Sequence, residues 1–175
     1  MSVFLIVFLA GTAMLAFASR SYLVRPRSYG FFRFWAFTGL LGLVLLNLDA
    51  WFKRPAAPLQ LASWVLLGGS VALALQGFLL LRLRGQPGGS IEATTVLVAS
   101  GVYRRIRHPL YASLLCFAWG VVLKDPSLAT ASLGGVVSIL LYLTARAEEQ
   151  ESRVKFGPAY QEYAARTKRF IPFLF

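Results

Sequence analysis

Long apolar runs limit what this 175-residue chain can fold into. The runs cover residues 3–19, 34–51, 61–83, 110–123 and 127–145. A helix that crosses the hydrocarbon core of a bilayer needs about 20 apolar residues, with a range of roughly 17–25. Only the run 110–123 falls clearly short of that length. We therefore expect an all-α membrane protein with about five transmembrane helices.

The composition favours lipid as the surrounding solvent. Charged residues make up 14% of the chain, whereas soluble domains carry roughly 25%. The net charge of +11 comes from basic residues placed between the apolar runs. This placement favours contact with anionic lipid headgroups over nucleic acid. We therefore predict membrane lipids, and no nucleic acid, as partners.

Lysine and arginine residues are distributed unevenly among the connecting segments. Fifteen lie in the segments 20–33, 82–107 and 146–169, and three lie between runs on the opposite side. Cytosolic loops of membrane proteins carry an excess of these residues. The distribution predicts an integral membrane protein with its N-terminus outside and its C-terminus in the cytosol.

The last two apolar runs are expected to form a helical hairpin, because only Lys124-Asp125-Pro126 separates them. Asp125 is a residue type favoured at helix N-caps, and proline suits the first turn of the helix that follows. Because the run 110–123 is short, the turn either reaches the far membrane interface or stops before it. Both ends of the hairpin then lie on one side of the membrane.

The cysteine and histidine content argues against a metal or redox function. The chain has one cysteine, Cys116, and one histidine, His108. One thiol cannot form an internal disulfide, and the two residues together cannot supply the four ligands of a structural zinc site. We therefore expect no metal site.

The first of two polar stretches, residues 100–111, combines basic and aromatic side chains. Pro109 is well suited to the first turn of the next helix. The start of a helix carries unpaired N–H groups and a partial positive charge. Arg107 and His108 stand beside it, so together they predict a site for an anion. The same stretch offers two flat faces for stacking, those of Tyr103 and Tyr111.

The second polar stretch begins with Glu148 and Glu149, directly after the last apolar run. Glu149 and Arg153 have the i,i+4 spacing of helix surface pairs, and adjacent acids after a span are usually solvated. Gly157 and Pro158 are predicted to end this helix, because glycine suits a C-cap and proline cannot continue the helix.

Four motifs follow one another in this C-terminal part. They are Gly101-Val102-Tyr103 through Arg107-His108-Pro109-Leu110-Tyr111, then Glu148-Glu149, then Phe156-Gly157-Pro158-Ala159-Tyr160-Gln161-Glu162-Tyr163, then Arg169-Phe170-Ile171-Pro172. Their order and spacing resemble the isoprenylcysteine carboxyl methyltransferase family, a broad membrane family that includes phospholipid N-methyltransferase relatives. The resemblance covers about residues 98–175. It divides the chain into N-terminal transmembrane helices, 1–97, and a methyltransferase core, 98–175, with a cytosolic helical segment at its end.

The resemblance implies S-adenosylmethionine as the methyl donor and a lipophilic acceptor that enters from the bilayer. That acceptor would be the carboxylate of an isoprenylcysteine-like substrate or a related lipid. Carried over by position, Arg107 and Glu149 would lie nearest the methyl-transfer centre. The cofactor pocket would be lined by Tyr103, His108, Pro109, Tyr111, Glu148, Tyr160 and Tyr163. The chain departs from the family pattern at Ser113, where glycine is usual and a larger side chain would narrow a close backbone approach.

Several functions stay open at this level. A carboxylate acceptor needs no general base and would be oriented by Arg107, whereas an amine must lose a proton, for which Glu149 and His108 are candidates. Sterol-type reductases, which use a reduced nicotinamide, share an Arg-His-x-x-Tyr element and a similar aromatic C-terminus. Those chains are much longer, and 175 residues leave little room for a dinucleotide site. A non-catalytic membrane scaffold is the third reading.

Overall fold

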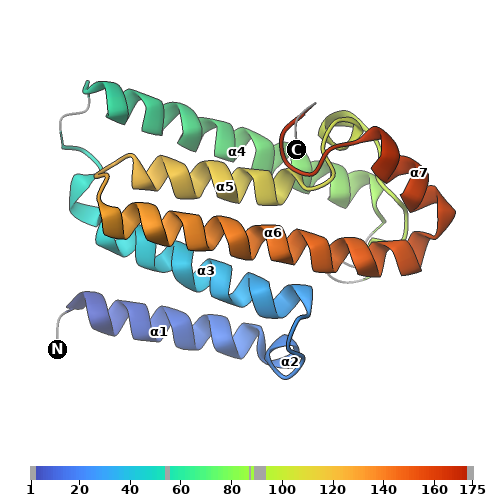
Figure 1. Cartoon of the computed structure of the whole chain (residues 1–175), viewed down its shortest axis with the longest axis horizontal. Coiled ribbons are helices and arrows are strands. Elements are labelled where there is room, and N and C mark those ends of the chain that lie inside the picture. Colours follow the sequence, from blue (N-terminus) through green and yellow to red (C-terminus); the bar gives the residue numbers. More distant parts are fainter. Residues whose placement is uncertain (1–2, 54–55, 87, 89–93, 173–175) are drawn as a thin grey trace. The chain divides into compact units, whose positions relative to one another are not determined.

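The fold is all-α, as expected, in the computed structural model, which describes residues 3–53, 56–86, 88 and 94–172 (Figure 1). Its α-helices are α1 (Val3–Ala18), α2 (Arg20–Leu23), α3 (Tyr29–Leu46), α4 (Pro58–Arg84), α5 (Pro109–Val122), α6 (Leu128–Phe156) and α7 (Pro158–Arg166). Two short 3-10 turns lie at Leu48–Ala50 and Gly101–Arg104.

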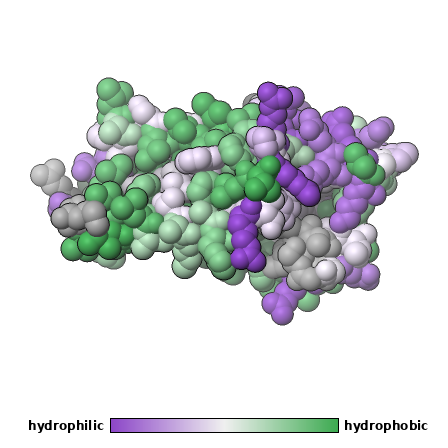
Figure 2. Space-filling model, turned by 90° about the horizontal axis from the view of Figure 1, so that it is seen from below, coloured by the Kyte–Doolittle hydropathy of each residue, from purple (hydrophilic) through white to green (hydrophobic). Residues whose placement is uncertain are grey.

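Three helices within the described ranges are long and apolar enough to cross a membrane, namely α3, α4 and α6. The apolar helices α1 and α5 are shorter, with 16 and 14 residues. Figure 2 shows hydrophobic residues over much of the visible face. These features indicate an integral membrane protein, while its orientation in the membrane stays a prediction.

Local hydrogen bonds, not hydropathy, set the ends of α3. The helix begins at Tyr29, ahead of the expected run 34–51, because the Ser28 Oγ accepts a hydrogen bond from the Phe31 N–H at 3.2 Å. It ends at Leu46, where the Asn47 Nδ2 donates to the Leu43 carbonyl at 3.0 Å. The predicted bounds are wrong at both ends. Apolar side chains indicate which residues can lie in lipid, whereas capping hydrogen bonds decide where a helix starts.

The start of α6 also differs from the prediction. Asp125 was expected as the N-cap, but the helix begins at Leu128. The Ser127 Oγ accepts from the Thr130 N–H at 3.2 Å, and the Thr130 Oγ1 accepts from the Ser127 N–H at 2.9 Å. This reciprocal pair satisfies two N–H groups at once, as a capping box does, and so outcompetes Asp125.

The end of α6 is confirmed as predicted. The helix stops at Phe156, and α7 starts at Pro158. Gly157 between them has φ +55°, a conformation that glycine adopts without steric cost. The polar end of α6 and the short helix α7 are therefore two separate helices, and each presents its own side chains.

The chain divides into two compact units, one of Met1–Leu67 with Leu115–Glu148 and one of Gly68–Leu114 with Glu149–Phe175. In the first unit α1 lies beside α3 (Figure 1). In the same unit, the Trp119 Nε1 of α5 donates to the Ser138 Oγ of α6 at 3.2 Å. The two helices that flank the turn at Lys124 therefore contact each other. The second unit holds the four sequence motifs except Glu148.

Candidate functional site

Two segments that flank helices of the second unit pair through their backbones. Ile106, before α5, and Lys168, after α7, form a parallel bridge. The Arg107 N–H donates to the Lys168 carbonyl at 2.7 Å, and the His108 N–H donates to the Arg169 carbonyl at 3.1 Å. The first and last motifs of the sequence are thus fixed against each other.

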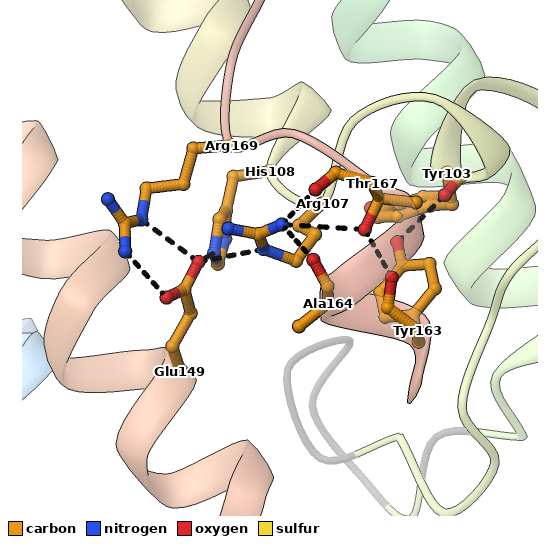
Figure 3. Close-up of polar contacts among 8 residues, drawn as sticks. All are labelled: Tyr103, Arg107, His108, Glu149, Tyr163, Ala164, Thr167 and Arg169. Carbon is orange, nitrogen blue, oxygen red and sulfur yellow. Dashed lines mark hydrogen bonds and ion pairs between the residues drawn. The ribbon is translucent and has the colours of Figure 1, made fainter. Parts of the chain in front are cut away.

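Glu149, on α6, is the carboxylate at the centre of this region (Figure 3). Its Oε1 accepts hydrogen bonds from the Arg107 Nε at 2.9 Å and the Arg169 Nε at 3.0 Å, and its Oε2 accepts from the Arg169 Nη2 at 3.0 Å. The His108 Nε2 lies 3.3 Å from Oε1. Glu149 is only 4% exposed, so three basic side chains enclose a buried carboxylate.

The environment of Glu149 keeps it ionised. Glu149 lies beyond the apolar stretch of α6, which ends at Ala145. Burial acts to raise the pKa of the Glu149 carboxyl, but hydrogen bonds from His108, Arg169 and Arg107 and the charge of Arg107 outweigh burial. They hold the pKa of Glu149 well below its usual range. The carboxylate is therefore a weak proton acceptor at neutral pH.

Arg107 connects the carboxylate to the end of α7 (Figure 3). Besides its bond to Glu149, its Nη1 donates to the Ala164 carbonyl at 3.0 Å and to the Thr167 carbonyl, and lies 3.5 Å from the Thr167 Oγ1. Two of the three guanidinium nitrogens are thus occupied by the protein. The anion expected beside Arg107 and His108 is the chain's own Glu149.

The structure excludes the alternative that Glu149 is a solvated acid on the helix surface. Its i,i+4 spacing to Arg153 fits a solvated pair, yet Glu149 is buried while Arg153 is exposed. The partners of Glu149 come from the loop before α5 and from the segment after α7, and helical spacing carries no information on such distant contacts.

Aromatic side chains surround the network. The Tyr163 hydroxyl donates to the Tyr103 carbonyl at 2.8 Å, and the Tyr160 and Tyr163 rings lie 5.9 Å apart. The His108 ring stacks on Tyr111 at 5.5 Å. Burial, and to a lesser degree Tyr160, raise the pKa of the Tyr163 phenol, while Arg107 acts to lower it. The phenol therefore stays neutral and serves as a donor.

The structure brings most of the predicted site residues together. Arg107, His108 and Glu149 share one network, and Tyr103 is bonded to Tyr163. Tyr111 lies against His108, and Tyr160 lies against Tyr163. Pro109 is buried and is the first residue of α5. Glu148 is half-buried. The binding and catalytic roles of these residues stay predictions.

Sequence reasoning missed two residues of the network, Arg169 and Thr167. Arg169 binds Glu149 through two nitrogens, and Thr167 accepts from Arg107. A signal for Arg169 existed, because it opens the last motif of the resemblance. The contribution of Thr167 is mainly its backbone carbonyl, which side-chain chemistry cannot indicate.

A cavity of about 520 Å³ lies beside α7. Its size falls within the range of small-molecule sites. Tyr163 and Thr167 line it and also belong to the network described above. The other lining residues are Leu97, Ala99, Arg104, Ala159, Glu162 and Arg166.

The departure from the family pattern at Ser113 is accommodated within α5. Ser113 is buried, and its Oγ donates to the Leu110 carbonyl at 2.6 Å. The hydroxyl group is therefore turned back onto its own helix. In the part of the chain that the structure describes, no group of three or more His, Cys, Asp or Glu residues could hold a metal ion.

Residues 59–158 match the phospholipid methyltransferase family. The matched range contains Arg107, His108 and Glu149 and ends before most of α7. This match supports the phospholipid branch of the resemblance stated above. The isoprenylcysteine carboxyl methyltransferases are a related family that it does not test.

One curated relative is similar over a large part of the chain. It is the cobalt-zinc-cadmium resistance protein CzcN of Cupriavidus metallidurans, which is 30% identical over 135 residues. The alignment covers 77% of this chain and 59% of the relative, so the chain spans about three fifths of that protein's length. No solved structure matches.

Proposed function

Because this chain belongs to the phospholipid methyltransferase family, we propose that it transfers a methyl group from S-adenosylmethionine to a lipophilic acceptor at the membrane. The observation that carries the proposal is the buried network around Glu149. It joins side chains from three of the four motifs, and a network of this kind fixes the segments that surround a reaction site. Membrane lipids are the proposed source of the acceptor.

The cavity beside α7 has a chemistry that fits the proposed cofactor. Arg104 can pair with a carboxylate, and the ring of Tyr163 can stack on a flat base. Arg166 and Glu162 form an ion pair with each other, which a bound ligand would exchange for contacts with its own carboxylate and ammonium groups. S-adenosylmethionine has all three groups. When bound, it supplies a methyl group activated on a sulfonium sulfur. The predicted residues around His108 and Tyr111 would extend this site toward the membrane.

The proposed task of Arg107 and Glu149 is to hold the reacting groups in place. Arg107 bonds α6 to the end of α7, and Arg169 bonds the following segment to the same carboxylate. Correct orientation of two reactants can supply up to about 7–11 kcal/mol of a reaction barrier. A rigid set of charge-assisted hydrogen bonds is suited to that task.

The ionised state of Glu149 bears on whether the acceptor is an amine or an anion. A carboxylate with a depressed pKa and two occupied oxygens is a poor base for an amine. Of the two bases considered, His108 is the better one. An acceptor that attacks as an anion needs neither. We further propose that the site faces the cytosol, which a reporter fused to the C-terminus tests directly.

Equilibrium binding of radiolabelled S-adenosylmethionine to the purified protein tests the proposal. We expect saturable binding for the wild type and at least a tenfold loss of affinity for Arg107→Ala. Arg153→Ala, on the exposed face of the same helix as Glu149, is the matched control and should bind normally. Saturable binding of a reduced nicotinamide instead would support the reductase reading, and binding of neither compound would support the scaffold.

A further inference from the structure

Lys124 is a buried cation that the candidate site does not use. It lies in the turn between α5 and α6 and is only 5% exposed. Its Nζ donates to the Gln60 Oε1 at 3.1 Å and lies 3.4 Å from the centre of the Trp64 ring and 5.5 Å from that of Trp51. Among the described residues, no carboxylate forms an ion pair with this ammonium group.

These contacts leave the charge of Lys124 only partly compensated. An ammonium group has three N–H donors, and Gln60 accepts from one of them. Indole faces attract a cation but accept no strong hydrogen bond. Burial lowers the pKa of Lys124, as expected for a cation without an anionic partner.

Helix packing does not explain why a charged residue occupies this position. The Gln60 side chain already holds the turn, because its Nε2 donates to the Ala50 carbonyl at 3.2 Å and to the Lys124 carbonyl at 2.9 Å. The second of these bonds uses the backbone of residue 124 and would form with any side chain there. The ammonium group therefore needs another explanation.

Lys124 is one of the residues that line a cavity of about 370 Å³. Lys53 and Asp125 also line it, so the two ammonium groups outnumber the single carboxylate. The volume suits a lipid headgroup and is small for a whole lipid. Leu59 and Leu123 supply apolar wall, which suits the start of an acyl chain.

The cavity lies where apolar helices end. Lys124 follows α5 and precedes α6, and Leu59 and Gln60 belong to the first turn of α4. The ends of apolar helices meet the headgroup layer of a bilayer, where lipid phosphates are concentrated. We propose that this cavity binds the phosphate of an anionic lipid headgroup, with Lys124 as its main cation and Lys53 as a second one.

Titration of the purified protein with short-chain lipids tests this site. Tryptophan fluorescence is a suitable signal, because Trp51 and Trp64 both lie against Lys124. We expect a saturable change with dihexanoyl phosphatidic acid below its micelle concentration, and none with dihexanoyl phosphatidylcholine. Lys124→Met should weaken the affinity by about tenfold or more, since hydrogen bonds to charged groups are among the strongest. Lys155→Met, at an exposed position of α6, is the matched control and should bind as the wild type does.

Inorganic phosphate distinguishes two sources of the same chemistry. If phosphate competes only at far higher concentration than the lipid, the ligand is a lipid headgroup. If it competes equally well, the site takes free phosphate. Should Lys124→Met fail to fold, Lys53→Met, on an exposed residue of the cavity, should weaken lipid affinity several-fold. An absent or non-saturable response of the wild type, or unchanged affinity in the lysine variants of the cavity, would overturn the proposal.

Discussion

Two buried charge clusters in the described part of the chain balance their charges in different ways. Around Glu149, one carboxylate faces three basic side chains, and each of its oxygens accepts at least one hydrogen bond. Around Lys124, one ammonium group faces two indole rings and one amide oxygen, with no acid in contact among the described residues.

The difference shows which cluster can hold itself together. Removing a charge from water is costly, and a counter-ion with good hydrogen bonds repays much of that cost. The Glu149 cluster contains its own counter-ions and can order the segments around it. Lys124 has no ion pair among the described residues and borders a cavity. We therefore assign a positioning task to the first and a ligand site to the second.

Glu149→Ala should have the largest effect. It leaves Arg107, His108 and Arg169 without their shared carboxylate, and breaking a buried ion pair costs about 3–5 kcal/mol. Denaturant unfolding of the detergent-solubilised protein measures this loss of stability.

The matched control for that variant is Glu162→Ala. Glu162 forms an i,i+4 ion pair with Arg166 on an exposed surface of α7, so its loss should cost at most about 0.5 kcal/mol. Equal losses for the two variants would mean that the Glu149 network is no stronger than a surface pair.

Lys124→Met should cost less than Glu149→Ala. The variant removes the buried charge itself and leaves only the Gln60 Oε1 without a donor, which costs about 1–3 kcal/mol. The same unfolding measurement, without added lipid, gives the value. A loss of stability as large as that of Glu149→Ala would show that Lys124 has a counter-ion of its own. The two clusters would then not differ in how they balance their charges.

Acid should weaken the Glu149 cluster alone. Because its folded-state pKa is depressed, Glu149 contributes stability above its unfolded-state pKa of about 4.3, and this contribution is lost as the pH falls below that value. Between about pH 6 and pH 3 the melting temperature of the wild type should therefore fall more than that of Glu149→Gln. Parallel curves for the two proteins would contradict the depressed pKa.

The sequence predicted features that depend on local chemistry. Pro109 begins α5, and Gly157 with Pro158 separates α6 from α7, because these residues restrict the backbone wherever they occur. The apolar runs all became helices, although their caps shifted the ends of α3 and α6. Arg107, His108 and Glu149 were predicted to lie close together because both polar stretches were placed on the same side of the membrane. The family resemblance added their roles in methyl transfer.

Features that depend on distant contacts could not be predicted in this way. Arg169 reaches Glu149 only because its segment pairs with the loop before α5. Lys124 was counted simply as a basic residue between two helices, yet the structure buries it. Both cases require knowledge of which side chains from other elements lie opposite, and helical periodicity does not contain it.

Transfer of a labelled methyl group to lipid tests the central claim most directly. The protein would be reconstituted in native membrane lipids and incubated with S-adenosylmethionine labelled on its methyl group, and the extracted lipids would be examined by mass spectrometry. We predict label in a lipid species with the wild type and with Arg153→Ala, and none above background with Arg107→Ala. Absence of lipid label with the wild type, or equal label with Arg107→Ala, would contradict the proposed function and its site.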